Sequence, residues 1–157
     1  MGPLSILISA FAVAVVTIKI TSKTFQLQLG GRIAMSVMLL FTATGHFLFA
    51  EGMAQMIPDF IPFRNAWVYL TGFLEIAAAI GLQIPRLRST TGWLLIVFFV
   101  LIFPANIHAA VESINFQTGE HDGPGLAYLW FRVPLQILFI VWTYLSAIAS
   151  LKKVKYG

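Results

Sequence analysis

A single carboxylate stands in the middle of an apolar stretch of this chain. Glu75 lies within residues 69–79, where most neighbouring side chains are apolar or small. A charge at the centre of a membrane helix costs about 2.5–3.5 kcal/mol even on the lenient insertion scale, so Glu75 needs a partner or a proton. It either joins two helices as a protonated or hydrogen-bonded group, or it anchors a ligand or handles a proton. Gly72, Ala78 and Ala79 lie around it at helical spacing, which predicts that it faces neighbouring helices.

Two histidines and an asparagine lie near the ends of other apolar stretches. His46 is a packing residue if it is alone, but beside an acid it could exchange protons near neutral pH. Pro104 removes one backbone donor and frees the carbonyl of Val100, and Asn106 either repairs that kink or lines a site. His108 is two residues further on and so points to a different face of the helix.

An arginine and a glutamine share one face of the last apolar stretch. Arg132 and Gln136 are four residues apart and flank Pro134. Because arginine keeps its proton, Arg132 either extends to the outer interface or pairs with a carboxylate such as Glu75 or Glu51. In the first case Glu75 is neutral, and in the second it is ionised.

Several kinds of active site are excluded by residue type or by spacing. The chain has no cysteine, so it has no disulfide, no thiolate nucleophile and no cysteine-held metal cluster. It also lacks a phosphate-binding glycine loop and a nucleophile elbow. His46, His108 and the glutamates have no recognisable ligand spacing, so no metal site is predicted. We expect no haem, flavin or iron–sulfur cluster, and any redox role would need a bound cofactor or a partner.

The composition indicates a membrane protein that positions these residues inside a bilayer. Hydrophobic residues make up 59% of the 157 residues and charged residues 10%, and the mean hydropathy is +0.86. These values are far from those of soluble domains. The net charge of +4 is divided among short loops, which excludes nucleic acid as a partner. We predict one all-α membrane domain whose partner is the lipid bilayer.

Five apolar stretches are long enough to cross a membrane. They are residues 3–20, 32–50, 66–84, 92–111 and 128–150. Nothing basic precedes the first stretch and no cleavage pattern closes it, so it is predicted to be a retained helix and not a signal peptide. The connection 85–91 is short, which makes the third and fourth helices antiparallel neighbours. In the longer connection 51–65, two prolines prevent a continuous helix, and its apolar side chains place it in the interface or back against the bundle.

The charged residues alternate between the two sides of these stretches. Eight of the ten basic residues lie in three segments (Lys19, Lys23, Arg32; Arg86, Arg88; Lys152, Lys153, Lys155), and five of the six acids lie between them (Glu51, Asp59; Glu112, Glu120, Asp122). The positive-inside rule then places the N-terminus outside and the C-terminus in the cytoplasm. In this orientation the non-cytoplasmic half holds His46, Asn106, His108, Arg132 and Gln136, with Glu75 near mid-membrane.

Several short motifs together resemble those of the DoxX-like bacterial membrane proteins. They are Gly45-His46-Phe47, Met56-Ile57-Pro58 with Ile61-Pro62, Tyr69-Leu70-Thr71-Gly72 followed by Glu75, Gly81-Leu82 with Pro85-Arg86, Phe103-Pro104-Ala105-Asn106, and Arg132-Val133-Pro134-Leu135-Gln136. The resemblance covers about residues 30–150. It implies a four-helix membrane bundle over residues 32–150, preceded by an additional N-terminal helix and inner loop in residues 1–31 and followed by a basic cytoplasmic tail in residues 151–157.

The same resemblance bears on function. Some members of that family are subunits of quinone-linked thiosulfate oxidation or of membrane oxidoreductase assemblies, and a distant animal relative assists receptor assembly. We predict a multi-pass protein of the bacterial cytoplasmic membrane that is accessory and not itself an enzyme. Its polar pocket near the outer leaflet is predicted to bind a lipid-like ligand or a partner helix. The predicted lining is His46, Glu75, Asn106, Arg132 and Gln136, with Glu51, Tyr69 and His108 in secondary positions.

The sequence is also compatible with two other functions. The first is a quinone-linked oxidoreductase subunit, in which His46 and Glu75 handle the protons of quinone reduction and a redox partner subunit supplies electrons. The second is a proton-coupled transporter with Glu75 as the proton carrier. Five unequal spans without an inverted repeat disfavour the transporter.

Overall fold

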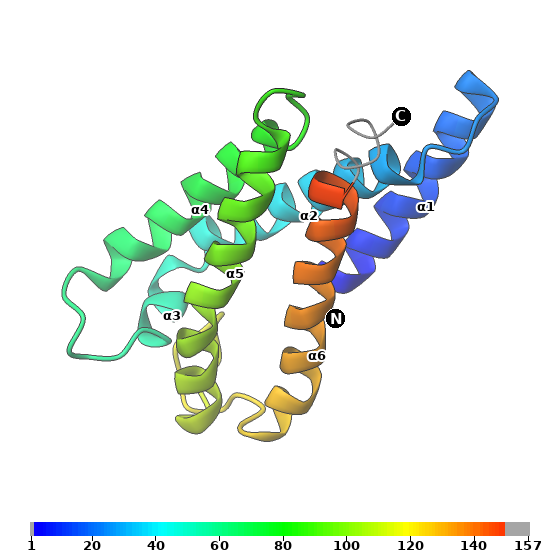
Figure 1. Cartoon of the computed structure of the whole chain (residues 1–157). Coiled ribbons are helices and arrows are strands. Elements are labelled where there is room, and N and C mark those ends of the chain that lie inside the picture. Colours follow the sequence, from blue (N-terminus) through cyan, green and yellow to red (C-terminus); the bar gives the residue numbers. More distant parts are fainter. Residues whose placement is uncertain (1, 150–157) are drawn as a thin grey trace.

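The computed structural model describes residues 2–149, and every regular element in this range is a helix. Five long helices correspond to the five predicted stretches (Figure 1), and a short helix and a π-helical turn add to them. The elements are α1 (Gly2–Ser22), α2 (Leu27–Leu48), α3 (Ala50–Gln55), α4 (Arg64–Gly81), α5 (Arg88–Val111), α6 (Ala127–Thr143) and η1 (Tyr144–Ile148). The predicted tail, residues 151–157, lies outside the described residues.

Four of these helices are long and apolar enough to cross a membrane. Within the described range they are α1, α2, α5 and the continuous helix Ala127–Ile148 formed by α6 and η1. α4 is not among them, because its 18 residues include Arg64 and Asn65 at the start and Glu75 further along. The four apolar helices indicate a membrane protein.

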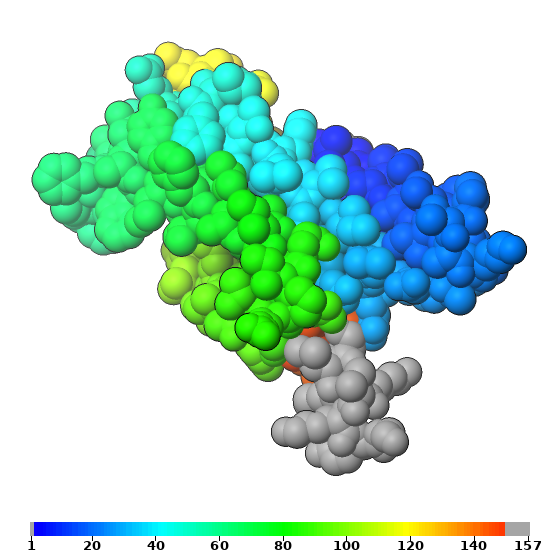
Figure 2. All heavy atoms as spheres, turned by 90° about the horizontal axis from the view of Figure 1, so that it is seen from above, coloured from blue at the N-terminus to red at the C-terminus, as the bar shows by residue number. Residues whose placement is uncertain are grey.

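α2 lies at the centre of the bundle. It packs against α1 on one flank and against α4 on the other, and it also contacts α6 and η1, while α5 pairs with α6. The core is densest along α2, where Met35, Met38 and Leu39 are almost fully buried. α1 is peripheral (Figure 2) and buries only Leu7 and Ala14. Leu4, Ile6, Ala10 and Phe11 pack partly against the core, whereas Ile8, Val13, Val16 and Ile20 are exposed and available to lipid.

The two ends of the bundle carry opposite charge. At one end lie the α1–α2 and α4–α5 connections and the end of α6 (Figure 1), and we call it the basic end. The basic end holds Lys19, Lys23, Arg32, Arg86 and Arg88. The acidic end consists of α3 and the α3–α4 and α5–α6 connections, and it holds Glu51, Asp59, Glu112, Glu120 and Asp122. The alternation of charge along the sequence is thus also a separation in space.

The segment 51–65 is more than a linker. Its first residues form α3, and its carbonyl at Met56 lies 3.1 Å from Nδ1 of His108, which attaches the segment to the end of α5. Phe60 and Phe63 are each 83% exposed. Aromatic side chains of this kind suit the interface region of a bilayer. The segment therefore combines a contact that folds it back on the bundle with an apolar outer surface.

Candidate functional site

His46 of α2 and Glu75 of α4 face each other inside the bundle. Nε2 of His46 lies 3.5 Å from Oε2 of Glu75. Nδ1 of His46 lies 3.1 Å from the hydroxyl oxygen of Thr71, which is itself 2.8 Å from the carbonyl of Val68. Because a carbonyl only accepts, we assign the Thr71 proton to that carbonyl and a proton to Nδ1 of His46.

With Nδ1 protonated, Nε2 of His46 faces Oε2 of Glu75. If the two groups share one proton, as imidazolium with carboxylate or as imidazole with carboxylic acid, the net charge of the pair is zero. A neutral pair avoids the large cost of a lone buried charge. The distance of 3.5 Å is longer than an ordinary hydrogen bond, and Oε2 of Glu75 has no hydrogen-bond partner within residues 2–149.

A glycine allows the two helices to approach at this point. A Cβ atom at Gly72 would lie 3.0 Å from Cβ of His46 and 3.3 Å from the ring of Phe47. Gly72, Glu75 and Ala79 are all buried, whereas Ala78 is half-buried. The predicted inward orientation of Glu75 is therefore confirmed, with glycine providing the space beside it.

Asn106 and Gln136 are buried and bonded to backbone carbonyls. Nδ2 of Asn106 donates to the carbonyl of Ile102 at 3.0 Å, within α5. Its side chain thus supports its own helix beside Pro104, although the acceptor is not the Val100 carbonyl that the proline frees. Nε2 of Gln136 donates to the carbonyl of Phe99 and so links α6 to α5. Gln136 thus joins two helices of the bundle, whereas Asn106 bonds only within its own helix.

Arg132 is half-buried on α6, one turn before Gln136. Tyr128, one turn earlier on α6, and Glu75 are both near enough to interact electrostatically with its guanidinium. Among the described residues, no carboxylate lies within 4.0 Å of its guanidinium. Glu51, the other candidate partner, is exposed on α3. Arg132 is therefore near the His46–Glu75 pair in electrostatic terms without direct contact.

Three of the predicted site residues carry a buried polar atom that has no hydrogen-bond partner. These atoms are Oε2 of Glu75, Nε of Arg132 and Oε1 of Gln136. Each such atom costs about 1–3 kcal/mol when nothing satisfies it. Within residues 2–149 the only other atoms of this kind belong to Arg88 and Ser146, at the basic end. Three of the five unpartnered buried atoms thus belong to residues of the predicted site.

The secondary residues have other roles in this structure. His108 bonds the Met56 carbonyl, and Tyr69 is 42% exposed and stacks on Phe47, with ring centroids 6.0 Å apart. Two residues that matter here were not predicted from the sequence, namely Thr71 and Tyr128. Each lies one turn before a predicted site residue on the same helix, so helical spacing could have indicated them.

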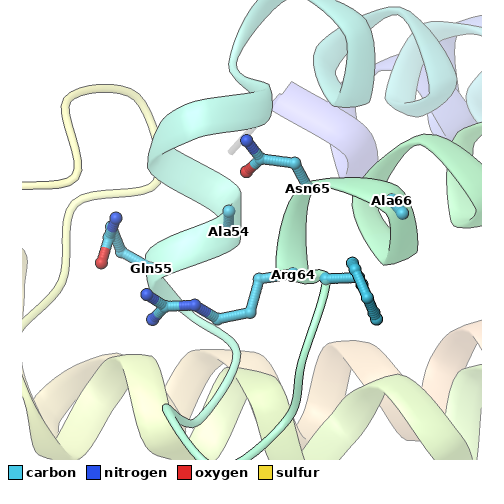
Figure 3. Close-up of a pocket in the computed structure, with 6 residues that line it drawn as sticks. Ala54, Gln55, Arg64, Asn65 and Ala66 are labelled. Atoms are coloured by element: carbon cyan, nitrogen blue, oxygen red, sulfur yellow. The ribbon is translucent and has the colours of Figure 1, made fainter.

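Two cavities lie elsewhere in the molecule. One of about 380 Å³ lies between α3 and the start of α4 (Figure 3), where Arg64 and Asn65 reach toward α3. Arg64 also forms an ion pair of 2.6 Å with the exposed Asp59. The other, of about 200 Å³, lies between α1 and α6 and is lined by Leu4, Trp130, Phe131, Pro134, Leu135 and Leu138. Neither is lined by a predicted site residue.

Comparison with known proteins gives one match. No curated protein and no solved structure matches the chain. A family profile described as a domain of unknown function (DUF8561) matches residues 35–147, which include all five residues of the predicted polar lining and leave out α1. Because the match covers most of the chain, this protein belongs to the DUF8561 family.

Proposed function

We propose that this protein is an accessory or binding protein of a membrane, with a polar site between α2, α4 and α6 that receives the head of a lipid-like ligand. The observation that carries the proposal is the set of three unpartnered buried atoms on Glu75, Arg132 and Gln136. One of them belongs to the His46–Glu75 pair, whose distance of 3.5 Å is too long for an ordinary hydrogen bond, and the other two lie one turn apart on α6. A packing scaffold would leave fewer such atoms in one region.

The unpartnered atoms define the chemistry of the ligand head. Nε of Arg132 can only donate and Oε1 of Gln136 can only accept. Oε2 of Glu75 donates or accepts according to its protonation. A head group with both a donor and an acceptor, such as a hydroxyl next to a carbonyl, would satisfy all three. Its apolar remainder would lie among the surrounding apolar helices.

The topology that we propose has five crossings, an outer N-terminus and a cytoplasmic C-terminus in a bacterial cytoplasmic membrane. The separation of the basic end from the acidic end supports this orientation. The buried position of Glu75 supports a crossing by α4, because α4 directs its charged group into the bundle and away from lipid. The DoxX-like motifs support the same bundle.

The test is ligand retention by the full chain purified in a mild detergent. Lipids extracted from the protein are quantified by mass spectrometry for the wild type, Glu75→Gln, Arg132→Met and the control Glu51→Gln, which changes an exposed acid. We expect a co-purified lipid-like species in the wild type and the control, and its loss in the other two. Equal retention in all four contradicts the proposal. A co-purified membrane protein in place of a lipid, lost in the same variants, would identify a partner helix as the occupant.

A quinone is the second candidate ligand. It is favoured by the imidazole and the carboxyl group that face each other at 3.5 Å, because groups of both kinds can transfer the protons that quinone reduction takes up with its electrons. A partner subunit would supply the electrons, because the chain has no cysteine. Quinone that co-elutes with the wild type and is absent from Glu75→Gln would favour this function. A retained lipid with no quinone would count against it.

A further inference from the structure

Two arginines lie near each other at the basic end of the bundle. Arg32 lies in the second turn of α2 and is only 7% exposed, and its Nη1 donates to the carbonyl of Ser146 at 3.1 Å. Arg88 is the first residue of α5 and is half-buried. The two guanidinium groups are close enough for their charges to repel each other. The basic end therefore holds two like charges that are partly shielded from solvent.

No carboxylate side chain of this protein neutralises the two arginines. All six acids lie within the described residues; five are at the acidic end, and the sixth, Glu75, is paired with His46. His46 is about four turns from Arg32 along α2, roughly 20 Å away. Residues 150–157 contain neither aspartate nor glutamate. No acidic side chain of the protein therefore supplies a counter-charge at this place.

The packing holds Arg32 in place. A Cβ atom at Gly31 would lie 2.9 Å from Cβ of Ser146, so α2 and η1 are in close contact there. Nε1 of Trp142 donates to the Gly31 carbonyl at 3.0 Å and reinforces that contact. If the Arg32 side chain extended to the aqueous interface, which is the usual behaviour of an arginine near a helix end, it would lose its bond to the Ser146 carbonyl. The packing of α2 against η1 therefore accounts for the burial of Arg32.

Two further polar atoms at this place have no hydrogen-bond partner among residues 2–149. They are Nε of Arg88 and the hydroxyl oxygen of Ser146, a residue that is 6% exposed. A guanidinium offers a planar fork of donors that matches the oxygens of a phosphate. The Ser146 hydroxyl can donate to the same group. One phosphate would thus neutralise both charges and satisfy both unpartnered atoms.

We infer that Arg32, Arg88 and Ser146 form a binding site for a phosphate group, and that in the membrane this group is the headgroup phosphate of an anionic phospholipid. The exposed Lys19 and Lys23 at the same end attract anionic lipid to it. Basic sites between membrane helices near the cytoplasmic surface bind such headgroups. This site shares no residue with the one proposed for a lipid-like ligand near Glu75, and either one stands without the other.

The test is native mass spectrometry of the full chain in detergent, titrated with palmitoyl-oleoyl phosphatidylglycerol or with phosphatidylcholine of the same chains. We expect tighter binding of phosphatidylglycerol, weakened about tenfold by Arg88→Gln, as loss of a charge-assisted contact predicts. Arg86→Gln is the matched control, because Arg86 is exposed and lies two residues earlier, in the α4–α5 connection. Equal binding of both lipids, or equal loss in both variants, overturns the inference. Arg88 makes no side-chain hydrogen bond within the described residues, so Arg88→Gln should fold.

A second measurement distinguishes the two sources of phosphate. Thermal unfolding in detergent is followed with added inorganic phosphate and, separately, with added phosphatidylglycerol. Stabilisation by the lipid at much lower concentration than by inorganic phosphate, lost in Arg88→Gln, supports the headgroup. Equal stabilisation by both, lost in Arg88→Gln, keeps the phosphate site and overturns the lipid as its source. No stabilisation by either overturns the site.

Discussion

The imidazole of His46 and the carboxyl of Glu75 lie 3.5 Å apart between α2 and α4, with the other ring nitrogen of His46 fixed by Thr71. The two side chains form a largely buried pair, in which Oε2 of Glu75 has no hydrogen-bond partner among residues 2–149. Removal of either one leaves a buried group without its partner, and this gives the first prediction.

His46→Ala should destabilise the protein by about 3–5 kcal/mol if Glu75 is ionised, because an uncompensated buried charge remains. Adding Glu75→Gln should then restore part of the loss, since the amide carries no charge. Thermal or denaturant unfolding of the two single variants and the double variant in detergent measures the coupling. Additive effects would show that the two groups do not interact.

Gly72→Ala should lower stability because the new methyl group would press on His46 and Phe47. Overpacking costs about 1–3 kcal/mol, which exceeds the gain of about 1 kcal/mol that alanine brings to a helix. Gly45→Ala is the control, since its Cβ would meet only the end of Met53 at 3.5 Å. The difference between the two unfolding temperatures is the readout, and a Gly72→Ala protein as stable as the control would argue against close helix contact at this point.

His108→Ala should loosen the segment after α3, because the bond to the Met56 carbonyl is lost. Limited proteolysis of the purified protein should then cut residues 56–63 faster than in the wild type. His121→Ala removes a histidine from the α5–α6 connection and should leave that cleavage unchanged. An unchanged rate in His108→Ala would mean that the segment is held by its apolar contacts alone.

The proposed topology can be tested with single cysteines, because the chain has none of its own. If α4 crosses the membrane, Gln55→Cys and Arg86→Cys lie on opposite sides. A membrane-impermeant maleimide added to intact spheroplasts should label Gln55→Cys and not Arg86→Cys. Labelling of both from outside would rule out the crossing by α4, and the reverse pattern would invert the orientation.

Helix positions were predictable because apolar stretches are bounded by charged or proline-containing connections. The short helix α3 was missed, since Pro58 and Pro62 made the whole segment 51–65 look irregular although its first residues carry no such restriction. The orientation of Glu75 followed from the small residues around it. The hydrogen bonds of Asn106 and Gln136 could not be foreseen, because both end on backbone carbonyls, which every sequence offers at every position.

The burial of charged side chains also could not be predicted from the sequence. Arg32 and Arg88 appeared as ordinary basic residues at the cytoplasmic ends of helices, since the positive-inside rule gives a side of the membrane and says nothing of depth. The contact between α2 and η1, which the sequence does not reveal, encloses Arg32.

The proposal of a bound lipid-like ligand is best tested by the amount of ligand bound per protein molecule. This amount is measured by lipid extraction and mass spectrometry in the wild type and in Glu75→Gln. We expect about one lipid-like molecule per protein molecule in the wild type and its loss in the folded variant. The same amount in both would contradict the proposed ligand site.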